Sequence, residues 1–207
     1  MCIRDRLLLS VFLTSSGQKS ESLRAYLSHA AFFAPEHGPY LETYLSILGS
    51  SIQFSRKENG KFQGTVMVTM LFKQNDSIKD FRKYDLLTVE TDDTTHINFI
   101  LFDQQRIALP SGKYDLELEL ADKNRQSQAF KAKDIVIVNF DSNKIIVSDI
   151  ELVESFTEAT ESSAMAKSGY DFIPYQDLYY PQSISKITFY AEIYNTTALL
   201  GADAQFI

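Results

Sequence analysis

The sequence has little of several residues on which common functional sites depend. It holds one cysteine, Cys2, in 207 residues, together with no tryptophan and eight glycines. A single cysteine excludes a disulfide framework and a metal site built from several thiolates. The glycines form no phosphate-binding loop ahead of a helix, which argues against nucleotide binding. Basic charge is also scarce: 20 Lys and Arg face 27 Asp and Glu for a net charge of −7, with no basic cluster, so we expect no nucleic-acid partner.

Long hydrophobic runs are missing as well. The apolar stretch at residues 7–13 is far shorter than the roughly 18–20 residues of a spanning helix, so we expect no transmembrane span. Arg4 and Arg6 precede this stretch and small residues follow it, which is the layout of a signal peptide. We therefore expect a signal-peptide-like segment at residues 1–19 and an extracytoplasmic location, in the periplasm or cell envelope. The opening residues 1–6 also resemble an artefact of environmental sequence assembly, an interpretation under which the true start is missing.

What the chain does have is alternation of apolar and polar residues with a period of two. Residues 114–120 read Tyr-Asp-Leu-Glu-Leu-Glu-Leu, the pattern of an antiparallel strand with one wet face. Asn-Gly at 59–60 and Pro-Ser-Gly at 110–112 are turn signals between such runs. Because no amphipathic helix is evident, the pattern predicts an all-β fold, an antiparallel β-sandwich of the immunoglobulin or fibronectin type. The other strand-like runs are residues 40–48, 62–72, 84–89, 95–102 and 130–140.

We place a domain boundary at Asp141. The β-branched run at 135–138 is expected to be buried on both faces, and Asp-Ser-Asn at 141–143 ends it. A β-sandwich domain is therefore expected at residues 20–141. Its first segment, residues 20–33, fits a helical face or a strand, and we favour the strand.

A second β domain is expected at residues 142–207. It has strand-like runs at 144–152 and 184–194, separated by a polar insert at 157–168. Two strands are marginal in water even when paired, so we expect this domain to be truncated and unable to fold alone. Residues 187–193 should then present an open apolar edge.

Eight short stretches share their residues with one bacterial family. They are Ala-Tyr-Leu at 25–27, Phe-Ala-Pro-Glu at 33–36, Pro-Tyr-Leu-Glu-Thr-Tyr at 39–44, Gly-Lys-Phe-Gln-Gly at 60–64, Phe-Asp-Gln-Gln-Arg at 102–106, Leu-Pro-Ser-Gly-Lys-Tyr at 109–114, Val-Ser-Asp-Ile-Glu-Leu at 147–152 and Phe-Tyr-Ala-Glu-Ile-Tyr-Asn at 189–195. On these stretches the chain, over residues 23–207, resembles the N-terminal half of bacterial GWxTD domain-containing proteins. The Gly-Trp-x-Thr-Asp motif itself is absent, because the chain has no tryptophan. The resemblance implies an exported, β-rich front portion whose naming domain lies beyond Ile207, and it carries over no functional residue.

Groupings suited to catalysis are few. Asp115, Glu117 and Glu119 share one strand face with neighbours about 6.6–6.8 Å apart, a spacing within the range of inverting glycosidases. We interpret them as a solvated face, because nothing nearby would bury one carboxyl and raise its pKa. The histidines, His29, His37 and His96, are isolated in sequence and form no metal-binding motif. We therefore predict no catalytic residue, no cofactor and no metal site.

One segment stands out in composition. Residues 170–181 hold two prolines and five aromatic residues, which are Tyr170, Phe172, Tyr175, Tyr179 and Tyr180. Exposed rings stack on sugars or anchor partner proteins, so these five are the candidate contacts for a ligand or partner. In the alternative that we favour, the rings pack in a loop under or between the two β units.

Three functions remain open from the sequence. The leading hypothesis is a non-enzymatic, exported β-sandwich scaffold or interaction module of a bacterial cell envelope. Its partners would be other envelope proteins or the missing C-terminal domain. The second hypothesis is a glycan-binding module that uses the aromatic segment at 170–180. The third is an accessory domain of an enzyme whose active site lies beyond Ile207.

Overall fold

The computed structural model describes residues 22–126, 128–160, 163, 166–176 and 180–203. The signal-peptide-like segment at residues 1–19 lies outside them. The described residues form an all-β, sandwich-like fold with a single short helix, α1 (Thr196–Leu200), which confirms the predicted fold class. None of the helical structure in this part of the chain is long and apolar enough to cross a bilayer.

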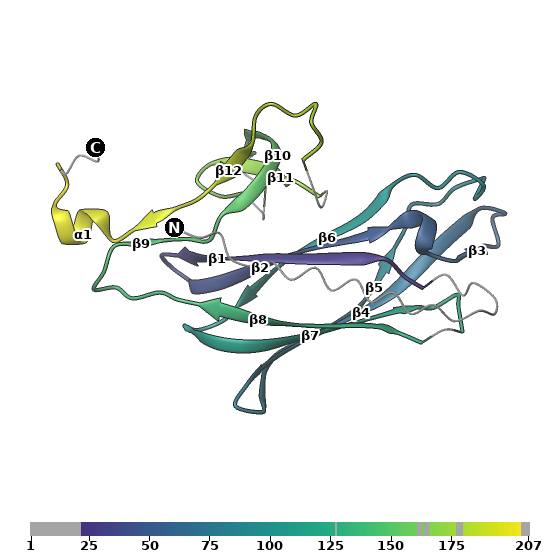
Figure 1. The fold of residues 1–207 in the computed structure, drawn as a ribbon, viewed down its shortest axis with the longest axis horizontal. Coiled ribbons are helices and arrows are strands. Elements are labelled where there is room, and N and C mark those ends of the chain that lie inside the picture. The colour runs from purple at the N-terminus through teal and green to yellow at the C-terminus, as the bar shows by residue number, and fades with distance from the viewer. Residues whose placement is uncertain (1–21, 127, 161–162, 164–165, 177–179, 204–207) are drawn as a thin grey trace.

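Two antiparallel sheets form the body of the molecule and lie one above the other in Figure 1. The first sheet has the order β1 (Ala25–Ala34), β2 (Gly38–Leu48), β6 (Ile100–Ala108). The second has the order β3 (Phe54–Arg56), β4 (Phe62–Gln74), β7 (Gly112–Asp122), β8 (Phe130–Val138), and β5 (Ser77–Leu87) pairs with β4. The segment at 20–33, where we favoured a strand over a helix, supplies most of β1.

The main core lies between these sheets and follows from the alternation in the sequence. Leu116, Leu118 and Leu120 of β7 are buried and stand directly opposite Phe72, Met70 and Val68 of β4. Such cross-strand pairs are the unit of sheet stabilisation. From the first sheet, Leu41, Leu45 and Ile47 of β2 complete the same cluster.

Turn chemistry explains where strand boundaries differ from the prediction. Asn75 and Asp76 both have positive φ, 49° and 62°, and join β4 to β5 in a two-residue hairpin. β5 therefore begins at Ser77, although the sequence pattern predicts a strand that starts at residue 84. β6 begins at Ile100 rather than residue 95, because the preceding segment crosses from one sheet to the other. The predicted Asn59-Gly60 hairpin is confirmed between β3 and β4, with a loop longer than two residues.

β8 corrects the expectation that residues 135–138 are buried on both faces. Val136 and Val138 are 0% and 2% exposed, whereas Ile135 and Ile137 are 51% and 62% exposed. β8 is the last strand of its sheet, and no described segment covers its outer face. Four consecutive β-branched residues therefore form an edge strand with one buried face.

A third layer follows Asp141. It consists of the sheet β11 (Tyr170–Pro174), β10 (Glu151–Glu158), β12 (Thr188–Tyr190) and of a short pair, β9 (Ile146–Val147) with β13 (Ile193–Tyr194). Figure 1 shows β10–β12 on the side of the first sheet that faces away from β7 and β8. The expected runs at 144–152 and 184–194 each divide between these two sheets, and β11 was expected to be a loop. The division into domains at Asp141 stays a prediction.

The third layer covers both the outer face and the free edge of the first sheet. Phe32 and Tyr44 are buried on the outer face, with Tyr190 of β12 packed against them. At the edge, the backbone N–H groups of Ala31 and Phe33 donate to Asp149 Oδ2 at 2.9 Å and to the Tyr194 hydroxyl at 3.0 Å. The first sheet is therefore a middle layer with packed residues on both sides, and two backbone donors on the outer edge of β1 are satisfied by side chains.

The position of β8 gives a test on two isoleucines. Ile107→Ala should lower the free energy of unfolding by about 2–5 kcal/mol, because Ile107 is fully buried in the main core. Ile137→Ala should change it by no more than about 0.5 kcal/mol, since this side chain faces solvent. Urea denaturation of the two variants measures both values. A loss at Ile137 as large as that at Ile107 would mean that the outer face of β8 is covered.

Candidate functional site

A buried group of charged residues lies between the first sheet and the third layer. Glu42 of β2, Glu151 of β10 and Lys167 from the turn before β11 are 0%, 2% and 4% exposed. Lys167 Nζ donates to Glu42 Oε2 at 2.6 Å and also to Glu151 Oε2. Arg106 Nε of β6 donates to Glu42 Oε1 at 2.6 Å. We call these four residues the Lys167 cluster.

Strand register places the half of this cluster that belongs to the first sheet. Glu42 stands directly opposite Arg106 in the β2–β6 pair, and Tyr44 stands opposite Gln104 on the same face. The Tyr44 hydroxyl donates to Glu42 Oε2 at 2.5 Å, and Gln104 Nε2 donates to the same oxygen at 3.3 Å. Glu42 is thus surrounded by donors, as a buried carboxylate requires.

A tight turn brings Lys167 into the cluster. Ser168 and Gly169 have positive φ, 49° and 83°, and Lys167 and Tyr170 exchange two backbone hydrogen bonds of 2.9 Å. This is a two-residue turn of the kind that joins antiparallel strands. It holds Lys167 at the end of a short, stiff loop, with its side chain directed at Glu42 and Glu151.

Three aromatic rings surround the ammonium group of Lys167. Nζ lies 4.3 Å from the ring centroid of Phe32, 5.3 Å from that of Tyr190 and 5.7 Å from that of Phe172. Ring faces attract a cation within about 6 Å, most strongly where water is excluded. The ammonium is therefore held by two carboxylates and three rings.

Burial and pairing act in opposite directions on the two carboxyl groups. Burial alone would raise the pKa of Glu42, but Lys167 and the hydrogen bonds from Tyr44 and Arg106 outweigh it and lower that pKa. Burial raises the pKa of Glu151, and attraction to Lys167 offsets only part of this effect. Because both acids are closed off and already bonded to Lys167, the cluster is suited to holding a cation rather than to acid–base catalysis on a substrate.

The predicted aromatic contacts divide between different settings. Phe172 is half-buried and faces the Lys167 cluster, with its ring centroid 4.5 Å from that of Tyr190. Tyr170 is exposed and meets Phe156 edge to face at 5.8 Å. Both belong to β11, so this part of the segment is a strand and not a loop.

The rest of that segment forms a separate pair. Tyr175 and Tyr180 stack with centroids 4.1 Å apart and planes 7° apart, and both are half-buried. Tyr179 lies outside the described residues. The structure therefore brings the four described candidates together in two groups and not in one platform. Tyr170 and Phe172 share one face of β11 with ring centroids 6.3 Å apart, and Tyr175 and Tyr180 stack on each other.

The acidic face of β7 carries paired charges. Glu117 receives hydrogen bonds from Lys73 at 2.7 Å and from Lys133 at 2.8 Å, and Glu119 lies 2.9 Å from Lys131. The hydrogen bonds from Lys133 and then Lys73 lower the pKa of Glu117 to about 2. A carboxyl that stays ionised at neutral pH is no proton donor for glycoside cleavage.

The histidines lie far apart in the fold. His29 on β1 is 3.2 Å from Asp134 of β8, His37 lies between β1 and β2, and His96 lies in the segment before β6. Within the described part of the chain, no three His, Cys, Asp or Glu side chains gather where they could hold a metal ion.

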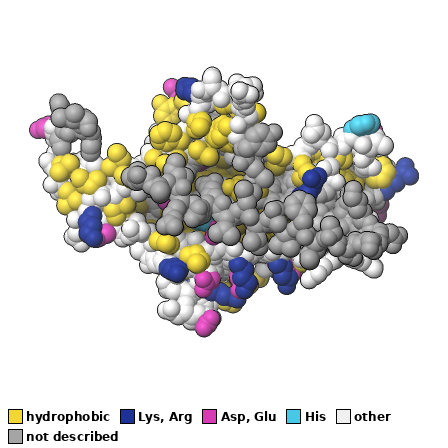
Figure 2. Space-filling view, viewed as in Figure 1, with side chains coloured by type: hydrophobic (Ala, Val, Ile, Leu, Met, Phe, Trp, Pro, Cys, Tyr) yellow, Lys and Arg dark blue, Asp and Glu magenta, His cyan; other side chains and the backbone are white. Residues whose placement is uncertain are grey.

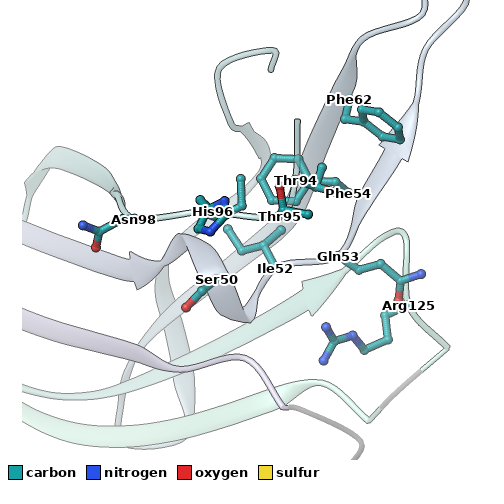
Figure 3. A pocket seen from close by; sticks show the side chains of 11 residues that line it. Ser50, Ile52, Gln53, Phe54, Phe62, Thr94, Thr95, His96, Asn98 and Arg125 are labelled. Carbon is teal, nitrogen blue, oxygen red and sulfur yellow. The ribbon is translucent and has the colours of Figure 1, made fainter. Parts of the chain in front are cut away.

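An open groove of about 710 Å³ lies near β3, a feature that the sequence did not indicate. Figure 3 shows its side chains spread around the groove rather than converging on one point. Arg125 donates to the Ser51 carbonyl at 3.3 Å, and His96 is the other titratable residue in the lining. The groove thus lacks a paired acid and base. Its lining residues are Ser50, Ile52, Gln53, Phe54, Phe62, Thr94, Thr95, His96, Ile97, Asn98 and Arg125.

The charge pairs of β7 can be tested by titration. The Glu117 carboxyl should titrate near pH 2 in carbon-detected NMR, against an ordinary value of 4.5. Its stabilising contribution is present above pH 4.5 and is lost as the pH falls through about 2. Lys133→Gln should move the midpoint upward, whereas Lys131→Gln, which removes the partner of Glu119, should leave it in place. A wild-type midpoint near 4.5 would contradict the pairing.

Comparisons with known proteins give no further assignment. No protein-family model matches the chain, and no curated protein or solved structure is significantly similar to it. The resemblance to GWxTD domain-containing proteins therefore stays an expectation.

Proposed function

We propose that the chain is a non-enzymatic, exported interaction module of a bacterial cell envelope, which binds a partner protein through the outer face of the sheet β11-β10-β12. The inner face of this sheet packs on the first sheet through Phe172 and Tyr190. Because side chains alternate along a strand, Ile173 and Phe189 point outward, and Ile187 shares the side of Phe189.

The observation that carries the proposal is that this outer face is apolar and bare. Ile173, Ile187 and Phe189 are 52%, 56% and 60% exposed, and half-buried Leu152 stands opposite Phe189 between them. Figure 2 shows hydrophobic side chains gathered over the lobe that contains β10–β12. An apolar patch on the surface of a soluble domain marks an interaction site. The open edge expected at residues 187–193 is found only in part. β12 pairs only with β10 among the described strands, so its other side is unpaired next to this face, whereas Ile193 pairs with Val147 of β9.

Export is the second part of the proposal. It rests on Arg4 and Arg6 ahead of the apolar stretch at 7–13. A fusion of the full chain to alkaline phosphatase, which is active only outside the cytoplasm, should give activity in a bacterial host. Deleting residues 1–19 should abolish that activity, and equal activity from both fusions would contradict the signal.

Photo-crosslinking tests the interaction face. A benzoylphenylalanine at position 189 should form a defined adduct in cells, because Phe189 is the most exposed residue of the bare face. The matched control is position 81, where Phe81 is 53% exposed against 60% for Phe189 but lies on β5, away from the third layer. Ile187→Asp should suppress the adduct at 189. Adducts of equal yield at both positions, or none at 189, would contradict the proposed face.

A second candidate function is glycan binding. Tyr170 and Phe156 are both exposed and meet edge to face, and exposed aromatic rings of this kind can stack on sugar rings. A glycan array should then give specific binding that is lost in Tyr170→Ala and kept in Tyr175→Ala, whose ring is stacked on Tyr180. Binding that is unchanged in both variants, or absent from the wild type, would argue against this candidate.

A further inference from the structure

The Lys167 cluster has walls from two separate layers of the molecule. Phe32 and Glu42 belong to the first sheet, whereas Glu151, Phe172 and Tyr190 belong to the third layer. The site is therefore complete only when the third layer is docked. Lys167 fills it from a turn in the third layer, so the chain supplies its own ligand.

The geometry suits a primary ammonium group. A compact ammonium has three N–H donors, and here two of them are met by Glu42 and Glu151 while the rings of Phe32, Phe172 and Tyr190 cover the remaining directions. A guanidinium is wider and planar, and a trimethylated ammonium has no N–H to donate. Because the site is closed to solvent, neither group fits without moving a wall.

Docking of the third layer on the first sheet requires a cation between the two buried carboxylates. Docking removes Glu42 and Glu151 from water, and an unpaired buried carboxylate is strongly unfavourable. Arg106 pairs with Glu42 from within the first sheet and also donates to the Ala166 carbonyl at 3.3 Å, whereas Lys167 Nζ is bonded to both carboxylates and so joins the charges of the two layers.

We infer that the Lys167 cluster is a binding site for a primary alkylammonium group, occupied in cis by Lys167, and that this occupancy holds the third layer on the first sheet. A site of this kind has a chemical signature. When the resident side chain is shortened, a free alkylammonium ion of matching shape occupies the space and restores docking.

The experiment uses the full chain with Lys167→Ala and n-propylammonium chloride as the added cation, because alanine keeps Cβ and the substitution removes three carbons and the ammonium. The variant should have a lower melting temperature than the wild type, and hydrogen exchange should be faster at the amides of β10–β12 while β4 and β7 stay protected. Adding n-propylammonium should recover about half or more of the loss in melting temperature with a saturating concentration dependence, as expected for a ligand that binds the folded state alone. It should also slow exchange in β10–β12.

Three controls separate this effect from general stabilisation. n-Propanol has the same chain without the charge, and n-propyltrimethylammonium has the charge without N–H donors, so neither should restore the variant. Lys131→Ala removes an exposed lysine that pairs with Glu119, and it should respond to none of the three compounds. Glu151→Gln combined with Lys167→Ala should reduce the response to n-propylammonium, because one of the two acceptors has lost its charge.

Refolding covers the case in which Lys167→Ala does not fold by itself. Dilution from urea should give folded protein with n-propylammonium and much less with n-propanol. Equal recovery with the two additives, or recovery with neither, overturns the inference. So does a Lys167→Ala variant whose β10–β12 exchange matches that of the wild type. These readouts do not depend on the partner-binding face, so they can fail while the proposed interaction function stands.

Discussion

The arrangement of the whole molecule depends on one ammonium group placed between two carboxylates. Lys167 and Glu42 are 125 positions apart in the chain, and their contact joins the third layer to the middle of the first sheet. Buried ion pairs contribute little net stability, because desolvation offsets much of the attraction. Their effect is selective: an arrangement that moves Lys167 away leaves buried carboxylates unpaired, so alternative placements of the third layer are disfavoured.

β2 shows what this constraint requires of a single strand. One face, with Leu41 and Leu45, belongs to the main core, and the other, with Glu42 and Tyr44, is covered by the third layer. The second face is polar yet buried, which is tolerated because its groups are bonded to one another. The interface between the layers thus combines ring packing around Phe32 with a set of buried charges, whereas the core between the two large sheets is mainly apolar, with the Thr43 hydroxyl donating to Met70 Sδ within it.

Alternation of apolar and polar residues was enough to predict the all-β fold and several strands. It worked best in β7, where Leu116 and Leu118 face the core while Glu117 faces water. The prediction that the β-branched run at 135–138 is buried on both faces was wrong. β-branched residues favour any strand, and the sequence does not say whether a second layer covers that strand. The acidic face of β7 carries paired charges. The sequence did not predict these pairs, because the lysine partners come from neighbouring strands that a linear pattern does not place.

The Lys167 cluster was missed because its members carry no joint signal in the sequence. Lys167 lay in a polar insert, where a lysine is ordinarily solvated, and Glu42 lay in the strand-like run at 40–48, where a single acidic residue gives no sign of burial. Only the Glu42–Arg106 pair follows from the β2–β6 register, which itself depends on the fold. Among the aromatic candidates, Phe172 does contribute to the site, but through its contact with the cation and not as an exposed platform.

The edge of β1 has a consequence for the order of events during synthesis. Its backbone donors at Ala31 and Phe33 are met by side chains located 118 and 161 positions later in the chain. At roughly 5–20 residues per second, ribosomes need about 8–32 s to add those 161 residues. Throughout that interval the first strand has an unsatisfied edge, which is the feature that leads unfinished β proteins to pair with their neighbours. A chain built in this way benefits from remaining unfolded, or bound to a chaperone, until its last strand has been made.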